Sequence, residues 1–284
     1  MRIIDAFCFF NELDMLELRL NILAPYVDHF IVVEADHTFS GQPKSSCFEA
    51  QRDRFKPFAG KIVHHVARID TRALDFSKRP DRFDQSTDFW KVEFSQRNAI
   101  ADALTQHFSP EDLAIASDVD EIPAPAAIDR IRRSAWRRLL ISHVPHIFRQ
   151  EEFYYNATNL RDEACLGSAI TSCATFARYT PQKIRSKRKR LPKIQDGGYH
   201  FSYFMTPELI ANKISSFSHQ EFNTDAYKSA TRITDCIEQG TDLFNRPIRS
   251  RHVDLTHFPP EVSHHLRRFP SFCGAPAVGA GESA

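Results

Sequence analysis

The sequence predicts an α/β protein with a mixed, mostly parallel β-sheet flanked by helices. Short runs of β-branched and aromatic residues at 3–10, 29–35 and 113–117 have the pattern of buried strands. Helical patterns at residues 13–23 and 90–107 separate these runs. Because a strand, a helix and a second strand fit within the first 35 residues, the first two strands form a βαβ unit and are expected to be parallel. This alternation is typical of a Rossmann-like sheet.

The first half of the chain supplies most of the predicted sheet. Four leucines recur at helical spacing between residues 13 and 23, Asn11 is in position to cap this helix, and Pro25 ends it. A third strand is predicted at residues 61–69, ahead of the helix at 90–107.

The pattern changes after Pro123, where strands become more frequent than helices. Further strands are predicted at residues 138–148, 152–156 and 168–179. Two helices are predicted to follow at residues 207–219 and 224–239, the second ended by Gly240. The small and polar C-terminal residues predict a disordered tail.

Composition excludes several classes of protein. The formal net charge of the 284 residues is +1, so bulk electrostatics do not favour nucleic acid as a partner. No apolar run reaches the roughly 18 residues of a membrane span, and Asp5 interrupts any signal-peptide core. Six cysteines lack metal-site spacing and are interpreted as buried free thiols, from which we expect a cytoplasmic location.

The strongest local signal is the segment LAIASDVDEIP at residues 113–123. A buried strand that ends in Asp118-Val119-Asp120 places two carboxylates at the edge of the sheet where ligands bind in open α/β folds. Two carboxylates with substrate phosphates are a site for Mg²⁺ or Mn²⁺, and a nucleotide diphosphate would supply the phosphates. The alternative is an acidic turn that caps the next helix.

A second group of candidates follows the strand at residues 29–35. Glu34, Asp36 and Thr38 lie at its carboxyl end, on the same predicted sheet edge as Asp118. Oxygens there can accept hydrogen bonds from a base N–H or a ribose hydroxyl. A solvated loop is the alternative.

Two further patterns remain open. His200, in the segment GGYHFSYF, is either a structural residue or a ligand, and the preceding run 183–193 holds seven basic residues in eleven. That run is either solvated and flexible or placed to neutralise a diphosphate. Glu93 and Arg97 share a face of the helix at 90–107 with Gln96, where a surface salt bridge is the alternative to a site.

Several ordered blocks together resemble glycosyltransferase family 17, which includes the animal enzyme that adds the bisecting N-acetylglucosamine to N-glycans. These blocks are DAFCFFNELDMLELRLNIL, VDHFIVVEADHTFSGQPK, WKVEFSQRNAI, SDVDEIP, GGYHFSYF, SFSHQEFN and FPPEVSHHLRRF. They run from residue 5 to residue 269 and so cover nearly the whole chain. Tyr199 stands where tryptophan is usual in the GGYH block.

The resemblance implies a GT-A fold and an inverting, metal-dependent transferase that uses a UDP-sugar, with UDP-N-acetylglucosamine as the expected donor. Residues 1–123 would form the nucleotide-sugar-binding half and 124–270 the acceptor-binding half of one domain, followed by a disordered tail at 271–284. The expected acceptor is a cell-surface polysaccharide, a lipid-linked saccharide or a protein glycan, and peripheral membrane contact is compatible with it.

The resemblance also assigns roles to residues. The expected metal ligands are Asp118, Asp120 and His200, and the expected donor-binding residues are Glu34, Asp36, Thr38, Lys44, Arg97 and Asp118. Inversion requires a base to deprotonate the acceptor hydroxyl. Glu221 is the first candidate, with Glu121 and Glu93 as alternatives.

Two other functions are compatible with the residues. A metal-dependent phosphohydrolase also uses Asp-x-Asp and histidines, but it would need a nucleophilic acid or a second metal cluster. A non-catalytic protein that binds nucleotide sugars would keep the fold without a base.

Overall fold

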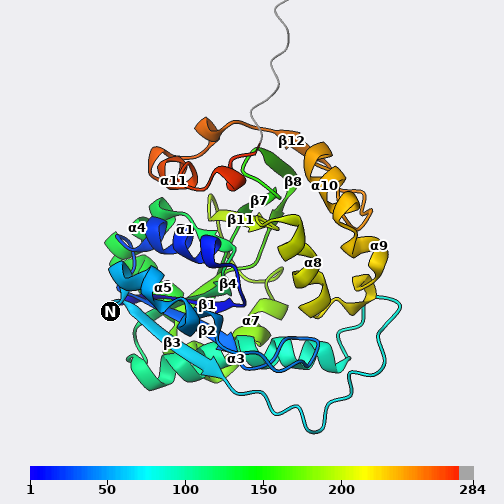
Figure 1. Ribbon diagram of the computed structural model, residues 1–284. Coiled ribbons are helices and arrows are strands. Elements are labelled where there is room, and N and C mark those ends of the chain that lie inside the picture. Colours follow the sequence, from blue (N-terminus) through cyan, green and yellow to red (C-terminus); the bar gives the residue numbers. More distant parts are fainter. Residues whose placement is uncertain (275–284) are drawn as a thin grey trace, which may run out of the picture.

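The computed structural model describes residues 1–274 and contains two mixed β-sheets flanked by helices, which confirms the predicted α/β class (Figure 1). The larger sheet has the strand order β10-β6-β9-β4-β1-β2-β3. β1 is parallel to β2 and β4, and β9 runs antiparallel between β4 and β6. The strands are β1 Ile3–Phe9, β2 His29–Ala35, β3 Ile62–Ala67, β4 Leu113–Asp118, β6 His146–Phe148, β9 Ala169–Ser172 and β10 Lys193–Ile194.

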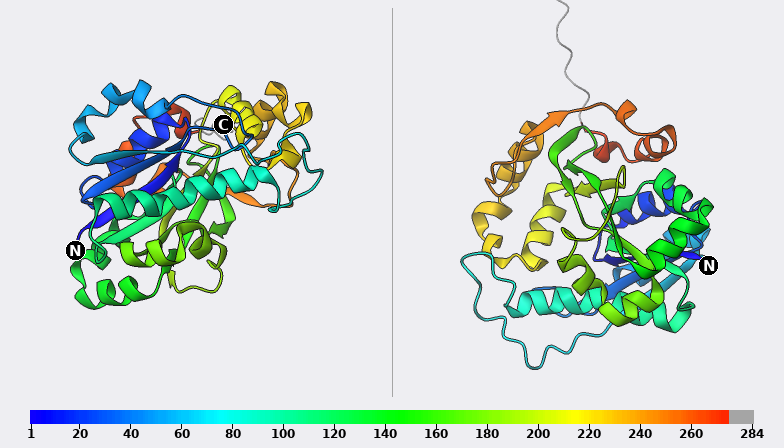
Figure 2. Two further views of the ribbon diagram at one scale, coloured as in Figure 1. Left: turned by 90° about the horizontal axis from the view of Figure 1, so that it is seen from below. Right: turned by 180° about the vertical axis from the view of Figure 1, so that it is seen from behind.

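Helices cover both faces of the larger sheet (Figure 2). Side chains of β1 alternate between the faces, as the geometry of a strand requires. Phe7 and Phe9 pack in one core cluster with the leucines of α1 (Leu13–Leu23), whereas Ile4 and Ala6 pack in another with α3 (Asp88–His107). Burial on both faces explains why the central strands read as continuous apolar runs in the sequence.

The smaller sheet has the order β12-β8-β7-β11-β5. Its strands are β5 Glu121–Pro123, β7 Gln150–Tyr154, β8 Asn159–Cys165, β11 Gly198–Ser202 and β12 Ser250–His252. β4 of the larger sheet ends at Asp118 and β5 of the smaller sheet begins at Glu121. The chain therefore passes from one sheet to the other through the loop that carries Asp118 and Asp120.

The remaining helices surround the two sheets. They are α2 Cys47–Ala50, α4 Pro125–Arg133, α5 Ala135–His143, α6 Cys173–Tyr179, α7 Pro181–Ser186, α8 Pro207–Ser216, α9 Asp225–Lys228, α10 Ala230–Gln239 and α11 Pro260–Leu266. Short 3₁₀ helices are η1 Arg52–Phe58, η2 Gln220–Phe222, η3 Leu255–His257 and η4 Pro270–Phe272. α8 and α10 pack with Tyr154 and Tyr155 in a third core cluster.

Two predictions for the second half are wrong in detail, and one strand was missed. Residues 138–143 belong to α5, because Ser134 caps this helix by accepting a hydrogen bond from the backbone N–H of Arg137. The strand expected at 168–179 ends at Ser172, whose side chain caps α6 in the same way. β8 was not predicted, since its sequence NLRDEAC is largely polar. Gly240 does end α10, with φ of +64° in the left-handed region.

The predicted halves, 1–123 and 124–270, do not coincide with the two sheets. The division at residue 123 does not separate the sheets, because β6, β9 and β10 from the second half complete the larger sheet. Phe272 is buried against the main core, so the chain is ordered beyond residue 271. The rest of the predicted tail, residues 275–284, lies outside the described residues.

Candidate active site at the end of β4

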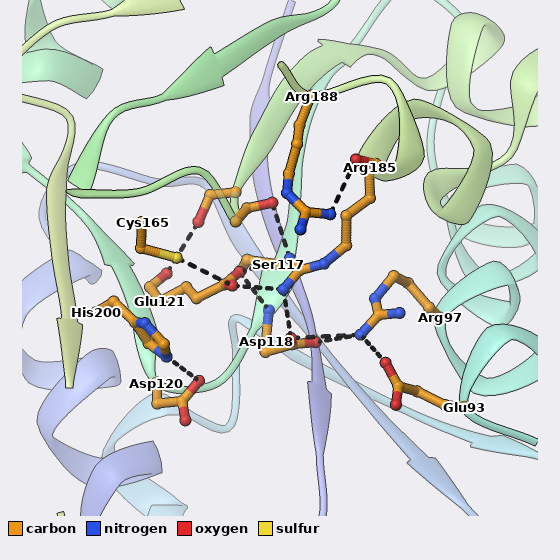
Figure 3. Close-up of polar contacts among 12 residues, drawn as sticks. Glu93, Arg97, Ser117, Asp118, Asp120, Glu121, Cys165, Arg185, Arg188 and His200 are labelled. Atoms are coloured by element: carbon orange, nitrogen blue, oxygen red, sulfur yellow. Dashed lines mark hydrogen bonds and ion pairs between the residues drawn. The ribbon is translucent and has the colours of Figure 1, made fainter. Parts of the chain in front are cut away.

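A cavity of about 490 Å³ opens at the carboxyl ends of β1 and β4. Its wall includes the loop after β4, one face of α3, the basic segment around α7, the second half of β11 and the end of α8. The side chains of Asp118, Asp120, Arg97, Arg185 and His200 converge here from four of these elements (Figure 3). The predicted placement of Asp-x-Asp at this sheet edge is therefore confirmed by the geometry of β4.

A buried arginine holds the backbone of the acidic loop. Arg19 of α1 is 0% exposed and forms a two-point ion pair with Asp5, at 2.6 and 2.8 Å. Its Nη1 also donates to the backbone carbonyls of Asp118, Val119 and Glu121, at 3.0, 3.1 and 2.9 Å. Because one rigid guanidinium binds three carbonyls, the loop has a fixed conformation under the cavity.

The Asp118 carboxylate lies between two arginines. Arg185 Nη2 is 3.0 Å from Oδ2, and Arg97 Nη2 is 3.2 Å from Oδ1. Burial raises the pKa of Asp118, but Arg185 and Arg97 outweigh burial and hold the pKa well below its usual range. Asp118 is therefore ionised, and its charge is compensated by protein cations.

Glu121 fixes the position of Arg185. The glutamate is 1% exposed, and its two oxygens accept hydrogen bonds from Arg185 at 2.7 and 3.0 Å. Oε2 also accepts from the backbone N–H of Asp118 at 3.1 Å. A Cβ placed on Gly167 would lie 1.8 Å from Glu121 Oε1, so glycine is needed there for the glutamate to fit. These contacts make Glu121 a buried support for the site.

Asp120 has looser contacts than Asp118. Its nearest cationic atoms are Lys213 Nζ at 3.4 Å and His200 Nε2 at 3.8 Å, both longer than a charged hydrogen bond of about 2.8 Å. Burial raises the pKa of this carboxyl. A buried carboxylate without a close partner fits a divalent cation, which could bind between Asp120 and donor phosphates.

The expected three-residue metal centre does not assemble in the protein alone. Within residues 1–274, no three His, Cys, Asp or Glu side chains are placed to hold a metal ion. Of the expected ligands, Asp118 is engaged by arginines, while Asp120 and His200 face each other. A cation at this position would take most of its ligands from phosphate and water.

The candidate residues that follow β2 fall into two groups: those that line the cavity and those that hold the loop behind it. Thr38 and Lys44 line the cavity, whereas Glu34 and Asp36 do not. Glu34 is fully buried and binds Lys44, the Ser46 hydroxyl and the backbone N–H of Cys47. Glu34 and Asp36 therefore lie behind the cavity wall, and direct nucleotide contact by these two residues stays a prediction.

The base candidates differ in their access to the cavity. Glu93 lines it, with one oxygen on Arg97 at 2.9 Å and the other accepting from the Ser218 hydroxyl. Glu221 does not line it and is 6% exposed as a side chain. Its Oε1 is instead 2.8 Å from Nδ1 of His219, which does line the cavity. In this segment it is therefore His219, and not the expected Glu221, whose side chain lines the cavity.

Sequence reasoning missed several residues of the cavity. Arg185 and Arg188 come from the basic run 183–193. The composition of this run fits a solvated segment as well as it fits an anion-binding site. Lys213 lies on α8 with no distinguishing neighbours in the sequence. The rings of Phe83 and Trp90 flank His219, with centroids 5.5 and 4.7 Å away. The seven basic residues in eleven were the one signal that could have indicated arginines at the site.

Comparison with protein families gives one clear result. The family model described as "Glycosyltransferase family 17" matches residues 1–249, which include every site residue described above. A search of curated proteins finds no match. Across residues 1–274, each helix is too short or too polar to cross a bilayer.

Proposed function

The chain belongs to glycosyltransferase family 17, and from this premise we propose that it transfers N-acetylglucosamine from a UDP-sugar to a hydroxyl of a glycan, with inversion at the sugar. The observation that carries the proposal is the convergence of two aspartates with five lysine and arginine side chains in one cavity at the end of β4. Those side chains are Lys44, Arg97, Arg185, Arg188 and Lys213.

The charges of the cavity support a diphosphate as the departing group. Acidic side chains on its wall pair with Arg97, Arg185 and Lys213. Among the described residues, Arg188 has no carboxylate within ion-pair distance. A diphosphate entering between Asp118 and the arginines could take over contacts that the carboxylate now makes. Arginine is suited to this because its planar fork matches phosphate oxygens as well as carboxylates.

A divalent cation, Mn²⁺ or Mg²⁺, belongs to the proposal. Asp120 and His200 are the residues that would hold it, since they face each other without a close partner. When bound, such a cation neutralises charge on the diphosphate leaving group. Arg185 and Arg97 would act beside it by orienting the phosphates and keeping Asp118 ionised.

We assign proton removal from the acceptor hydroxyl to His219. Glu221 accepts a hydrogen bond from Nδ1, which leaves Nε2 on the other edge of the ring free to accept a proton. Phe83, which is 57% exposed beside the imidazole, offers an aromatic surface that suits the apolar face of a sugar ring. Glu221 is then a positioning residue, and Glu93 is the alternative base.

The test is incubation of the purified chain with UDP-N-acetylglucosamine and Mn²⁺, with and without glycan acceptors. A transferase releases UDP, slowly with free sugar when no acceptor is present and faster with a suitable acceptor. Proton NMR of the product gives the configuration at the anomeric carbon. Release of inorganic phosphate would instead indicate a phosphohydrolase, and binding without turnover would indicate a nucleotide-sugar-binding protein.

The aspartates provide the matched pair of variants. Asp120→Ala should abolish the Mn²⁺-dependent part of UDP affinity, measured by calorimetry, because it removes the carboxylate without a close partner. Asp118→Asn should change UDP binding by the same factor with and without Mn²⁺, since its effect runs through Arg97 and Arg185. Unchanged Mn²⁺ dependence in Asp120→Ala would refute the metal assignment.

A further inference from the structure

Helix α5 carries a row of apolar side chains that faces solvent. Trp136 is 69% exposed, Leu139 55% and Leu140 39%, and their spacing of three and four residues places them on one side of the helix. Ile141 points the other way and is 3% exposed, in the main core. The helix is thus anchored through Ile141 while an apolar row remains uncovered.

The same region is strongly basic. Residues 130–138 contain five arginines and no acidic residue. Arg132 and Arg133 are paired with Asp28 and Asp129, each at 2.8 Å. Among the described residues, the other arginines of the segment, Arg130, Arg137 and Arg138, have no carboxylate within ion-pair distance. An anionic partner would therefore meet uncompensated positive charge here.

A second cavity, of about 360 Å³, lies beside α5. Arg130, Arg137 and Lys193 contribute cationic groups to its wall, and Leu140 with its neighbours contributes apolar surface. Asp196 also lines it, so the cavity is basic but not purely so. A phosphate group with an attached hydrocarbon would satisfy both kinds of surface.

We propose that α5, with the end of α4 and the cavity beside it, docks this protein onto a bilayer that contains anionic phospholipids. Trp136 and Leu139 would enter the interface between headgroups and acyl chains, where tryptophan is favoured. Arg130 and Arg137 would bind lipid phosphates. Exposed apolar residues flanked by arginines are the pattern of an interfacial helix. Since this surface is separate from the cavity at β4, the inference does not depend on the proposed reaction.

The experiment is sedimentation of the full chain with vesicles of phosphatidylcholine, with or without phosphatidylglycerol. We expect binding to the vesicles that contain phosphatidylglycerol and little binding to phosphatidylcholine alone. Each arginine near an anionic surface contributes about fivefold, so Arg130→Gln with Arg137→Gln should weaken binding about 25-fold. Trp136→Ser should also weaken it, and as an exposed substitution it should leave the melting temperature unchanged.

Tryptophan fluorescence supplies a second readout. The chain has two tryptophans, and Trp90 is 5% exposed, so a blue shift on adding vesicles would report Trp136. The matched control is Arg249→Gln with Arg251→Gln. Both arginines are exposed, and Arg251 lies on β12, across the molecule from α5 (Figure 1). This pair should bind vesicles as the unmodified chain does.

Three results would overturn the proposal. One is failure of the unmodified chain to sediment with vesicles that contain phosphatidylglycerol. Another is equal loss of binding in the control pair, which would indicate nonspecific charge attraction. The third is a dimer in analytical ultracentrifugation that Trp136→Ser dissociates, without vesicle binding, because a second copy would then cover α5.

Discussion

Replacing Arg19 by lysine should destabilise the protein and loosen the acidic loop together. Arg19 makes six hydrogen bonds, two to Asp5, one to the Ser117 hydroxyl and three to carbonyls of residues 118–121. A lysine ammonium has three donors, so at least three of these contacts are lost. At about 1 kcal/mol for each net bond, and more where a buried carbonyl stays unpaired, we expect a loss of about 3–5 kcal/mol.

The assay is urea unfolding at neutral pH, with UDP affinity measured on the same preparations. Arg54→Lys is the matched control, because Arg54 also pairs with two acids of the α1 region but at the surface, and it should cost at most about 1 kcal/mol. UDP affinity should fall in Arg19→Lys and not in Arg54→Lys. A loss below about 1 kcal/mol in Arg19→Lys, with normal UDP affinity, would refute the idea that this guanidinium holds the loop.

Three further predictions concern neighbouring groups. Gly167→Ala should cost about 1–3 kcal/mol and lower activity, since its Cβ would overlap Glu121; wild-type turnover would contradict this. Burial raises the pKa of Glu34, but hydrogen bonds from His64, Lys44 and Ser46 lower it to about 2. The ionised glutamate therefore stabilises the fold above pH 4.5, and that contribution of about 3 kcal/mol is lost as pH falls towards 2. Urea unfolding of Glu34→Gln should accordingly be less dependent on pH in that window. His219→Gln should reduce turnover by about 10²–10⁴-fold and Glu221→Gln by less, both with unchanged UDP affinity and melting temperature; full activity of both would shift the base to Glu93.

The parts of the fold that the sequence predicted are those buried on both faces. β1, β2 and β4 appear as apolar runs because neither face meets water, and their limits agree with the prediction within one or two residues. α5 was misread as a strand for the opposite reason. Three of its apolar side chains are exposed, namely Trp136, Leu139 and Leu140. The spacing of apolar residues in this segment therefore does not indicate which side of the helix faces the core.

The sequence predicted the parts of the site that depend on one continuous segment of the chain. Asp118 and Asp120 could be placed from the strand that precedes them. Arg185 could not, because its partner Glu121 lies 64 positions earlier in the chain, and a basic run has the same composition whether it is solvated or folded onto acids. Which of Glu221 and His219 faces the cavity depends on side-chain direction at η2, which the sequence does not specify.

The strand order of the larger sheet has a consequence for synthesis on the ribosome. β4 is complete at residue 118, but its neighbour on one side is β9, which ends only at residue 172. During the translation of the intervening 54 residues, one edge of β4 has unpaired backbone groups and adjacent apolar side chains. Such an edge can pair with other nascent chains. Slowing elongation or depleting chaperones over this interval should therefore increase aggregation more than the same treatment applied after β9 has emerged.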